Sequence, residues 1–419
     1  MAILRRDFVK LAAAAALWRH LRPAAAFSRS AGARRDGYEV AVIGAGAFGS
    51  WTAWQLQHAG KRVLLLDAYG PANARASSGG ESRVIRLGYG KDEIYTRMAM
   101  YSLDRWQELS DRAELPILHR IGALFLVGHS GTYGDDSLDT VRRVGGRIEA
   151  LSCEELAARY PQVKLDGIVR GQLEPESGAL MARRGVLTLV REFVRSGGDY
   201  LEDAVAPPKG EGRLEEVATR GGRRLRADAF VFACGPWMPR VFPTVIGGRI
   251  RATRQEVFFF GPAPGDGRFA PPALPVWLDV SNPSAIMYGM PNLESRGFKV
   301  ASDAHGPPID PDTADRRVSD AGLAAARRYL GRRFPALAHA PLLESRVCQY
   351  ENTSSGDFLI DRHPTLENVW LVGGGSGHGF KHGPAVGDYV ARAVRGELGT
   401  AEPRFSLGSK HMQERRAVH

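Results

Sequence analysis

The first strand-like run of apolar residues in the chain covers residues 38–43. Apolar side chains at helical spacing follow over residues 47–59, and a second apolar run occupies residues 62–66. Short runs without polar alternation are typical of strands that are buried on both faces, as in parallel sheets. The pattern therefore predicts a strand, a helix and a parallel strand in succession, which is a βαβ unit.

Two apolar runs much further along the chain have the same character. Residues 229–233 and 369–372 are short and apolar, and each leads into a glycine-containing segment. Because the strands of a parallel sheet can be contributed by distant parts of a chain, we expect these runs to join the strands of the βαβ unit. The prediction is one parallel sheet assembled from three separate regions.

The remaining segments predict a second domain. They combine proline and glycine turns with short strand-like runs, for example residues 257–260, which is typical of a mixed sheet. A chain of 419 residues also exceeds the size at which one core keeps growing. We predict an α/β fold in which a Rossmann-type domain is covered by a mixed-sheet α+β substrate domain. The predicted boundaries are 37–115, 176–249 and 343–400 for the first domain, 116–175 and 250–342 for the second, and 401–419 for a C-terminal tail.

Composition narrows the class of protein. The formal net charge is +10, but the basic residues are spread along the chain and do not form aromatic-interleaved patches, so nucleic-acid binding is not expected. No stretch approaches the roughly 18 uncharged apolar residues of a spanning helix, so no transmembrane domain is predicted. The three cysteines are far apart and lack metal-ligand spacing, which predicts neither a disulfide framework nor a metal site.

The N-terminal residues resemble an export signal. Residues 5–10 match the twin-arginine pattern, an apolar run follows at residues 11–18, and small residues precede a possible cleavage site after residue 26. We therefore expect residues 1–26 to direct the chain to the twin-arginine machinery and to the periplasm or the extracellular space, with residues 27–36 as a linker. The alternative is a cytoplasmic leader rich in alanine and arginine, because Arg19 interrupts the apolar segment early.

A dinucleotide-binding pattern follows the first predicted strand. Residues 44–49 read Gly-x-Gly-x-x-Gly and open the predicted helix, and Asp67 ends the second strand. Such glycines allow a tight turn and close approach of a pyrophosphate to the helix N-terminus, while the acidic residue accepts from a ribose hydroxyl. A glycine-rich packing turn is the alternative, and the pattern does not separate FAD from NAD. The predicted contacts are Gly44, Gly46, Ala47, Phe48, Gly49 and Asp67.

A second glycine-rich loop lies near the C-terminus, where residues 373–381 connect a strand to a helix that starts at about Pro384. Helix N-terminal amides and Lys381 would provide positive potential, which suits a reduced flavin or a substrate carboxylate. Residues 232–237 form a third strand-to-glycine junction. An ordinary glycine-rich turn is the alternative in both places. The loop residues predicted to contact a cofactor are Gly377, His378, Gly379, Phe380 and Lys381.

Together with these glycine loops, further segments make the chain resemble a known group of flavoproteins. Almost everything after the leader is similar to the monomeric sarcosine oxidase and N-methyltryptophan oxidase group of the D-amino-acid-oxidase-like FAD-dependent oxidoreductases. The segments that carry the resemblance are 77–86 (Ser-Ser-Gly-Gly-Glu-Ser-Arg-Val-Ile-Arg), 174–178 (Glu-Pro-Glu-Ser-Gly), 309–313 (Ile-Asp-Pro-Asp-Thr), 348–350 (Cys-Gln-Tyr), 357–364 (Asp-Phe-Leu-Ile-Asp-Arg-His-Pro) and 377–381 (Gly-His-Gly-Phe-Lys).

The resemblance implies a monomeric FAD enzyme whose first domain binds the cofactor. It implies oxidation of a secondary or N-methylated amino acid by hydride transfer to flavin N5, hydrolysis of the imine and reoxidation by O₂ to give hydrogen peroxide. One alternative is an FAD-dependent amino acid dehydrogenase that passes electrons to a quinone or carrier. Another is a non-catalytic binding protein that keeps the dinucleotide fold. An NAD-dependent dehydrogenase fits less well, because the Cys348 region has no role in it.

The resemblance also implies roles for individual residues. Cys348 matches the cysteine that forms a thioether to the flavin 8α carbon, Arg86 and Lys381 match the pair that grips the substrate carboxylate, and Lys299 matches the lysine that assists electron transfer to O₂. Tyr350, in the Cys-Gln-Tyr segment, is a further implied catalytic residue. The alternatives are a buried apolar cysteine, surface ion pairs for Arg86 and Lys381, and a solvated lysine on a strand. The remaining implied cofactor contacts are Ser77, Ser82, Arg83 and Val205.

The chain departs from the group on the flavin rim and on the substrate side. The group often has histidines where this chain has Ser78 and Gly79, and a histidine where Asp303 follows Lys299. It also tends to have paired tyrosines at the position of Met287 and Tyr288.

Overall fold

The computed structural model describes residues 37–129 and 132–412. The predicted export signal and linker, residues 1–36, and the last residues of the predicted tail lie outside the described residues. In this part of the chain no helix is long and apolar enough to cross a lipid bilayer.

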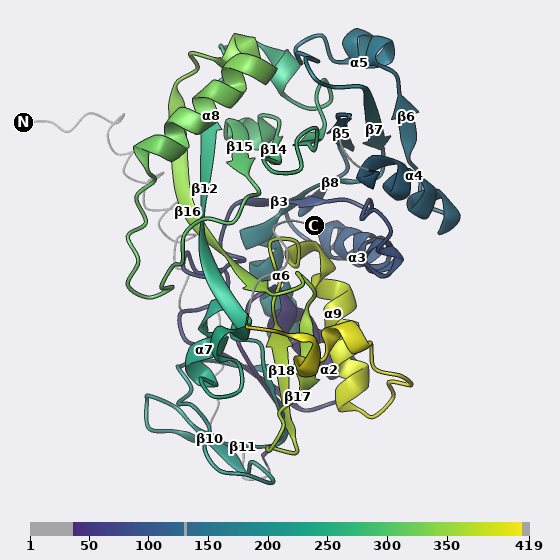
Figure 1. Ribbon diagram of the computed structural model, residues 1–419. Helices are drawn as coiled ribbons and strands as arrows, with labels where there is room; N and C mark the ends of the chain where they lie inside the picture. Colours follow the sequence, from purple (N-terminus) through teal and green to yellow (C-terminus); the bar gives the residue numbers. More distant parts are fainter. Residues whose placement is uncertain (1–36, 130–131, 413–419) are drawn as a thin grey trace, which may run out of the picture.

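A largely parallel sheet forms the lower half of the molecule in Figure 1. Its strands are β1 (Tyr38–Ile43), β2 (Val63–Asp67), β9 (Asp199–Glu202), β10 (Glu216–Ala218), β11 (Arg224–Phe232), β17 (Leu359–Arg362) and β18 (Val369–Gly373). The order is β17-β18-β11-β1-β2-β9, with β10 beside β11, and only β10 and β17 run antiparallel to their neighbours. This confirms the prediction of one parallel sheet built from distant segments.

Both faces of this sheet are buried, which explains the uninterrupted apolar runs. Along β1, Val40 and Val42 pack against the helices on one face, whereas Ala41 and Ile43 face the other core. The helices on the first face are α2 (Ala47–His58), α3 (Glu93–Asp111), α6 (Ala182–Arg195) and α9 (Gly383–Val394). The short helix α7 (Met238–Val241) covers the opposite face.

Helices α2 and α9 approach closely because α9 has glycine where they touch. A Cβ atom added at Gly383 or Gly387 would lie 2.6 Å from an atom of Trp51. Distances below 3.0 Å do not occur for real Cβ atoms, so the contact requires glycine at these positions. The packing holds the N-terminal end of α2, which follows the predicted dinucleotide turn, against the helix that follows the C-terminal glycine loop.

The second sheet forms the upper half of the molecule in Figure 1. Its strands are β5 (Ala123–Val127), β6 (Glu149–Leu151), β7 (Arg170–Glu174), β12 (Ile250–Phe260), β13 (Val276–Asp279), β14 (Met287–Met290), β15 (Phe298–Ser302) and β16 (Leu342–Thr353). The order is β16-β12-β15-β14-β13-β5-β7-β6, and β13 and β5 are parallel while the other pairs are antiparallel. The predicted mixed-sheet domain is therefore present. Helices α5 (Cys153–Arg159) and α8 (Asp320–Arg333) pack in its core, whereas Val141 of α4 (Tyr133–Arg143) packs in the core of the parallel sheet.

Smaller elements connect the two halves. A three-stranded sheet comprises β3 (Ser82–Ile85), β4 (Leu118–His119) and β8 (Gly178–Met181), with β8 in the centre. The 3-10 helices are η1 (Gly235–Trp237), η2 (Gly247–Arg249), η3 (Gly267–Phe269), η4 (Leu293–Ser295), η5 (Pro335–Leu337), η6 (Phe380–His382), η7 (Pro403–Phe405) and η8 (Leu407–Ser409).

The predicted domain boundary at residue 343 differs from the structure. Strand β16 pairs with β12 in antiparallel register from Ile250 opposite Thr353 to Phe260 opposite Leu342, so most of β16 belongs to the second sheet. The two strands also run from one core into the other: Ile250 packs in the core of the parallel sheet, whereas Phe258 and Phe260 pack in the core of the mixed sheet. In Figure 1 the paired strands β12 and β16 run from the upper half of the molecule into the lower half.

A buried ion pair holds α8 against the mixed sheet. The Arg333 Nε atom donates to Asp279 Oδ2 at 2.9 Å, the Tyr329 hydroxyl donates to the same oxygen at 3.0 Å, and the side chains of Arg333 and Asp279 are only 1% and 3% exposed. Removing one partner of such a pair leaves an uncompensated charge in the core.

We therefore expect Asp279→Asn to lower the free energy of unfolding by about 3 kcal/mol. Urea unfolding followed by circular dichroism would measure the loss as a lower midpoint. Glu149→Gln, in the exposed pair with Arg159, is the matched control and should leave the midpoint unchanged. Equal midpoints for Asp279→Asn and the wild type would show that the buried pair does not stabilise the fold.

Candidate active site

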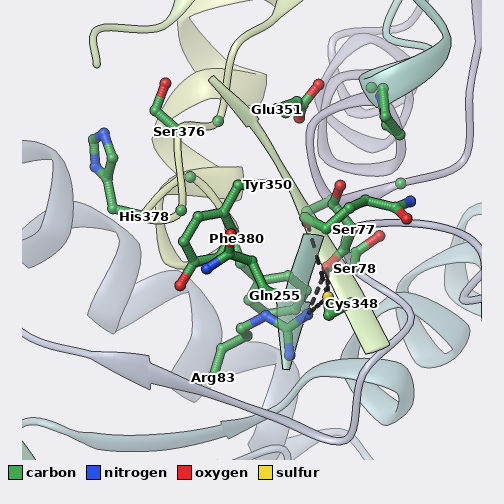
Figure 2. Close-up of a pocket in the computed structure, with 18 of the residues that line it drawn as sticks. Ser77, Ser78, Arg83, Gln255, Cys348, Tyr350, Glu351, Ser376, His378 and Phe380 are labelled. Atoms are coloured by element: carbon green, nitrogen blue, oxygen red, sulfur yellow. Dashed lines mark hydrogen bonds between the residues drawn. The ribbon is translucent and has the colours of Figure 1, made fainter. Parts of the chain in front are cut away.

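A cavity of about 1570 Å³ lies where the two sheets meet. Its walls come from the turn after β1, from β3 and the loop before it, from β12, β15 and β16, and from the C-terminal glycine loop. Of the predicted site residues, all line this cavity except Gly49 and Ser82. Figure 2 shows Arg83, Cys348 and Tyr350 close together in it.

The turn after β1 has the geometry of a phosphate-binding loop. Gly44 has a φ of +109°, and a Cβ atom there would lie 2.3 Å from the Ala233 carbonyl oxygen. A Cβ atom at Gly49 would lie 1.8 Å from the Gly44 oxygen, so the tight turn requires glycine at position 49. Gly49 itself does not line the cavity. Gly46 caps helix α2 with no side-chain hydrogen bond to its first amides. These amides can therefore donate hydrogen bonds to an anionic group.

Asp67 ends β2 beside this turn. Its Oδ2 atom accepts from the Ala45 amide at 2.8 Å, and its Oδ1 atom accepts from the Tyr69 amide at 2.9 Å. Burial raises the pKa of Asp67 to about 6, although these amides oppose the shift. Asp67, which the sequence predicts to contact a ribose, therefore lies at the cavity wall beside the turn.

The C-terminal glycine loop is packed between α2 and β16. A Cβ atom at Gly379 would lie 2.9 Å from the Phe48 ring, and one at Gly377 would lie 2.7 Å from the Tyr350 ring. The imidazole of His378 points away from Cys348 in Figure 2, and its nitrogens lie 3.2 Å from the Tyr89 hydroxyl and 3.1 Å from the Gly356 oxygen. The loop thus exposes backbone to the cavity and uses the His378 side chain to fix its own position.

Cys348 lies on β16 beside a cation. The Arg83 Nη2 atom donates to the Cys348 sulfur at 3.5 Å and to the Ser77 carbonyl oxygen at 2.5 Å. The Arg83 Nη1 atom donates to the Ser82 carbonyl oxygen at 2.8 Å. Ser82, a predicted cofactor contact, does not line the cavity, and its carbonyl oxygen accepts from Arg83 and Lys299. The predicted group of Ser77, Arg83 and Cys348 is brought together.

Lys299 is a buried lysine close to this group. Its Nζ atom donates to the Ser82 carbonyl oxygen at 3.0 Å, and the residue is 3% exposed. Burial lowers the pKa of Lys299 to about 7, and the charge of Arg83 adds to the effect. The expected alternative of a solvated lysine on a strand is therefore excluded.

Arg86 and Lys381 flank the ring of Tyr89. The Arg86 guanidinium lies 4.1 Å from the ring centroid, and the Lys381 Nζ atom lies 5.2 Å from it. Arg86 donates to the Gly88 oxygen and to the Tyr133 hydroxyl, and Lys381 donates to the His378 oxygen at 2.9 Å. Both residues are at most 5% exposed, so neither forms the surface ion pair that was the alternative. Burial holds the pKa of Lys381 well below its usual range, and the charge of Arg86 adds to this shift.

Two tyrosines and an aspartate form a hydrogen-bonded group that also lines the cavity. The Tyr350 hydroxyl donates to Asp303 Oδ1 at 2.8 Å and lies 3.4 Å from the Tyr288 hydroxyl. Burial raises the pKa of Tyr288 to about 12 and holds that of Tyr350 well above its usual range. Both phenols therefore stay protonated at neutral pH and can donate.

The structure adds Glu351, which the sequence did not indicate. Its Oε2 atom is buried and has no hydrogen-bond partner among the described residues, and the same holds for the Ser77 hydroxyl. Both residues line the cavity, and burial raises the pKa of Glu351 to about 7. Unpartnered polar atoms in a large cavity fit a polar ligand such as a dinucleotide. Val205, also predicted, lines the cavity and forms an isolated β-bridge with Thr219.

Comparison with known proteins finds a matching family profile, related sequences and a solved structure with the same fold. The sequence profile of a protein family described as FAD dependent oxidoreductase (DAO) matches residues 39–393. The chain is 30% identical to human peroxisomal sarcosine oxidase, over 85% of this chain and 91% of that protein. It is 27% identical to monomeric sarcosine oxidase of Bacillus sp. strain B-0618, over 90% of this chain and 97% of that protein. The solved structure of L-proline dehydrogenase from P. horikoshii has the same fold, with a TM-score of 0.75, 19% identity and coverage of 88% of this chain and 97% of that one.

Proposed function

Because the chain belongs to the FAD dependent oxidoreductase family, we propose that it oxidises a secondary or N-methylated amino acid with O₂ as the electron acceptor and hydrogen peroxide as a product. One observation carries the proposal: a single cavity contains a dinucleotide turn, a sulfur atom beside Arg83, a buried lysine and a buried Arg–Lys pair. The sarcosine oxidases to which the chain is similar support the choice of an N-methyl amino acid.

The residues present fit FAD. The turn at residues 44–49 and the N-terminus of α2 would hold the pyrophosphate, Asp67 would accept from a ribose hydroxyl, and the loop at residues 377–381 would pack along the flavin. When bound, FAD supplies the acceptor for the electron pair of the carbon–nitrogen bond.

Other side chains around the cavity would bind and orient the substrate and assist the reaction with O₂. Arg86 offers a planar fork and Lys381 a point charge for the substrate carboxylate, and the low exposure of both makes the contact strong. Tyr350 lines the cavity with its hydroxyl held by Asp303, and its ring would limit the orientations that a substrate can take. Lys299 places a cation where O₂ gains negative charge, and this charge is best stabilised in a site that excludes water.

Oxygen consumption and peroxide formation test the proposal. Purified protein would be screened with N-methylated, cyclic and D-amino acids in a peroxide-coupled assay. We expect peroxide only with amino acids that carry a free carboxylate, and anaerobic addition of the same compounds should bleach the flavin absorbance near roughly 450 nm. Bleaching without peroxide formation would favour a dehydrogenase that uses another acceptor. Protein without any flavin absorbance, even after reconstitution with FAD, would contradict the proposal.

We also propose that the flavin is attached covalently, as a thioether between its 8α carbon and Cys348. The position of the Cys348 sulfur at the cavity wall, in contact with the Arg83 guanidinium, supports this. Acid precipitation of the wild type should leave the yellow colour in the pellet, whereas Cys348→Ala should release nearly all of it into the supernatant.

Cys234→Ala is the matched control for this experiment. Cys234 also lines the cavity, but burial raises the pKa of its thiol, so its reactive thiolate is suppressed. This variant should retain the colour in the pellet. Free flavin from the wild type, or release from both variants, would contradict attachment through Cys348.

The proposed location is outside the cytoplasm, through twin-arginine export of a folded monomer. The proposal rests on the sequence of residues 1–26 alone. Fractionation of cells that carry Arg5→Lys together with Arg6→Lys would test it, since the double variant should accumulate in the cytoplasm with its full length.

A further inference from the structure

The carboxyl group of Glu351 is buried at the cavity wall, and the fold uses it only in part. Glu351 lies near the end of β16, is 9% exposed and is among the cavity residues drawn in Figure 2. Burial raises the pKa of its carboxyl group to about 7, although the Gly375 and Gly374 amides oppose the shift. The Oε2 atom has no hydrogen-bond partner in the part of the chain that the structure describes. A buried acceptor of this kind costs free energy unless a ligand or a water molecule donates to it.

Other carboxylates at the cavity wall have partners within the protein. Asp67 accepts from two backbone amides. Asp312 accepts from the Tyr69 hydroxyl at 2.7 Å and from the Trp237 indole at 2.8 Å. The described segments also contain no group of three or more His, Cys, Asp or Glu side chains that could hold a metal ion. Glu351 therefore offers a buried oxygen atom that suits a hydrogen-bond donor on a ligand.

The order of the parallel strands places this carboxyl group on the path of the cofactor. Strands β2, β1, β11 and β18 are neighbours in that order and run in the same direction, so their carboxyl ends meet at one edge of the sheet. Asp67 ends β2, the turn at residues 44–49 follows β1, Gly235 lies shortly after β11, and Gly373 ends β18. Cβ atoms built at Gly235 and Gly373 would lie 3.5 and 3.7 Å from Glu351 Oε2. The carboxyl group thus lies beside the ends of β11 and β18.

The covalent order of the parts of FAD identifies the part that reaches Glu351. The adenosine ribose is joined to the pyrophosphate, the pyrophosphate to the ribitol, and the ribitol to the flavin. With the ribose at Asp67 and the pyrophosphate at residues 44–49, the next part along this edge of the sheet is the ribitol, which carries three hydroxyl groups. The loop at residues 377–381, which would pack along the flavin, starts just after Gly375, and a Cβ atom there would lie 3.2 Å from Glu351 Oε1. Glu351 therefore lies between the pyrophosphate turn and the flavin loop.

We propose that Glu351 Oε2 accepts a hydrogen bond from a ribityl hydroxyl group of FAD. The inference rests on the proposed binding of FAD and adds a cofactor-binding residue to it. A carboxylate suits this role because a hydroxyl group donates, and a charged acceptor makes the hydrogen bond stronger. Asp67 would accept from a ribose hydroxyl in the same way. Carboxylates at the ends of the parallel strands would thus hold both polyhydroxyl parts of the cofactor, one on each side of the pyrophosphate.

Cofactor analogues that lack single hydroxyl groups test this contact. FAD and its 2′-, 3′- and 4′-deoxyribityl analogues would be titrated into the apoprotein of Cys348→Ala, in which no thioether to this residue can form. The change in visible absorbance gives each dissociation constant. We expect one of the analogues to bind at least about tenfold more weakly than FAD, because it leaves the buried Oε2 atom of Glu351 without a donor.

Variants in the same background separate this contact from a structural effect. Glu351→Leu should bind FAD at least about tenfold more weakly and should no longer distinguish FAD from that analogue. A structural role alone would weaken the binding of FAD and of every analogue by the same factor. Asp312→Asn is the matched control: Asp312 also lines the cavity, but its partners belong to the protein, so the ratio of affinities should not change.

Thermal unfolding gives a second measurement that does not depend on the folding of the Glu351→Leu apoprotein. A ligand that binds only the folded state stabilises it, so the wild-type chain reconstituted with the same analogue should have the lowest unfolding midpoint of the set.

Equal affinities of FAD and all analogues for Cys348→Ala, a distinction that persists in Glu351→Leu, or equal unfolding midpoints would overturn the inference and would indicate that water occupies the Oε2 position. These measurements contain no substrate. Failure of the contact is therefore distinguishable from failure of the proposed function, which would appear as missing peroxide with every amine.

Discussion

Replacement of Lys299 by methionine is expected to slow the reaction of the reduced flavin with O₂ by at least about a hundredfold. The physical reason is that O₂ gains a negative charge in a dry site, where a nearby cation is worth far more than in water. Methionine fills a similar volume without the charge. Stopped-flow mixing of the anaerobically reduced protein with O₂ would measure the rate, and reduction by substrate, measured separately, should change much less.

Lys410→Met is the matched control for loss of a buried lysine. Lys410 is 2% exposed, and burial lowers its pKa to about 8, but it does not line the cavity. Its replacement should leave the O₂ reaction unchanged. An unchanged O₂ rate in Lys299→Met would contradict the assigned role and would favour a dehydrogenase that transfers electrons to a quinone or carrier.

The reaction of the reduced flavin with O₂ should depend on pH. Lys299 is charged below its pKa, which is about 7 in the protein without cofactor, and an anionic reduced flavin would move this pKa upward. The rate of reoxidation should therefore be highest at low pH and fall as pH rises through a midpoint above 7. Lys299→Met should lack this fall.

Replacement of Arg86 by leucine is expected to lower kcat/KM for the amino acid substrate by about a thousandfold. Truncation of one partner of a buried, hydrogen-bonded charge pair costs about 4 kcal/mol, which corresponds to this factor. Arg86 is 5% exposed, so water cannot replace its contact with a substrate carboxylate. Steady-state kinetics with the amino acid and with its primary amide would measure the effect. The kcat/KM for the amide should fall little in the variant, because the amide has no carboxylate for Arg86 to bind.

Arg75→Leu is the control for the loss of positive charge. The Arg75 guanidinium lies 4.9 Å from the Tyr69 ring, on the dinucleotide side of the site, and its removal should leave kcat/KM nearly unchanged. Equal losses for the acid and the amide in Arg86→Leu would show that the residue maintains the fold of the pocket and does not bind the carboxylate.

Local sequence patterns were sufficient to predict the core of the fold. The predicted strand at residues 38–43 and the helix at 47–59 agree with β1 and α2 to within one residue, because both are defined by apolar periodicity and by glycines next to them. Strand β16 was harder to assign. Its membership of the second sheet depends on pairing with β12, about 90 residues earlier, and such a long-range contact leaves no local signal.

The sequence indicates candidate site residues where they stand in motifs and gives no signal for isolated side chains. Glycine turns are recognisable because only glycine fits their backbone, and Cys348, Lys299, Arg86 and Lys381 stand in segments with a family resemblance. Glu351 follows the Cys-Gln-Tyr segment, but only the three-dimensional structure shows that its Oε2 atom is buried without a partner. Glutamate residues are mostly exposed to solvent, so the presence of a glutamate on a strand does not by itself indicate a binding site.

The long pair of strands β12 and β16 limits how the enzyme can admit a substrate. These strands run from one core into the other, and their pairing keeps one register from Ile250 to Phe259 before it shifts at Phe260, so a hinge motion that separates the two halves would have to bend or break this ladder. We therefore expect the width of the site to change little during turnover. On this view, side chains and loops at the rim control access, and selectivity resides in the resting shape of the pocket and not in closure of one half upon the other.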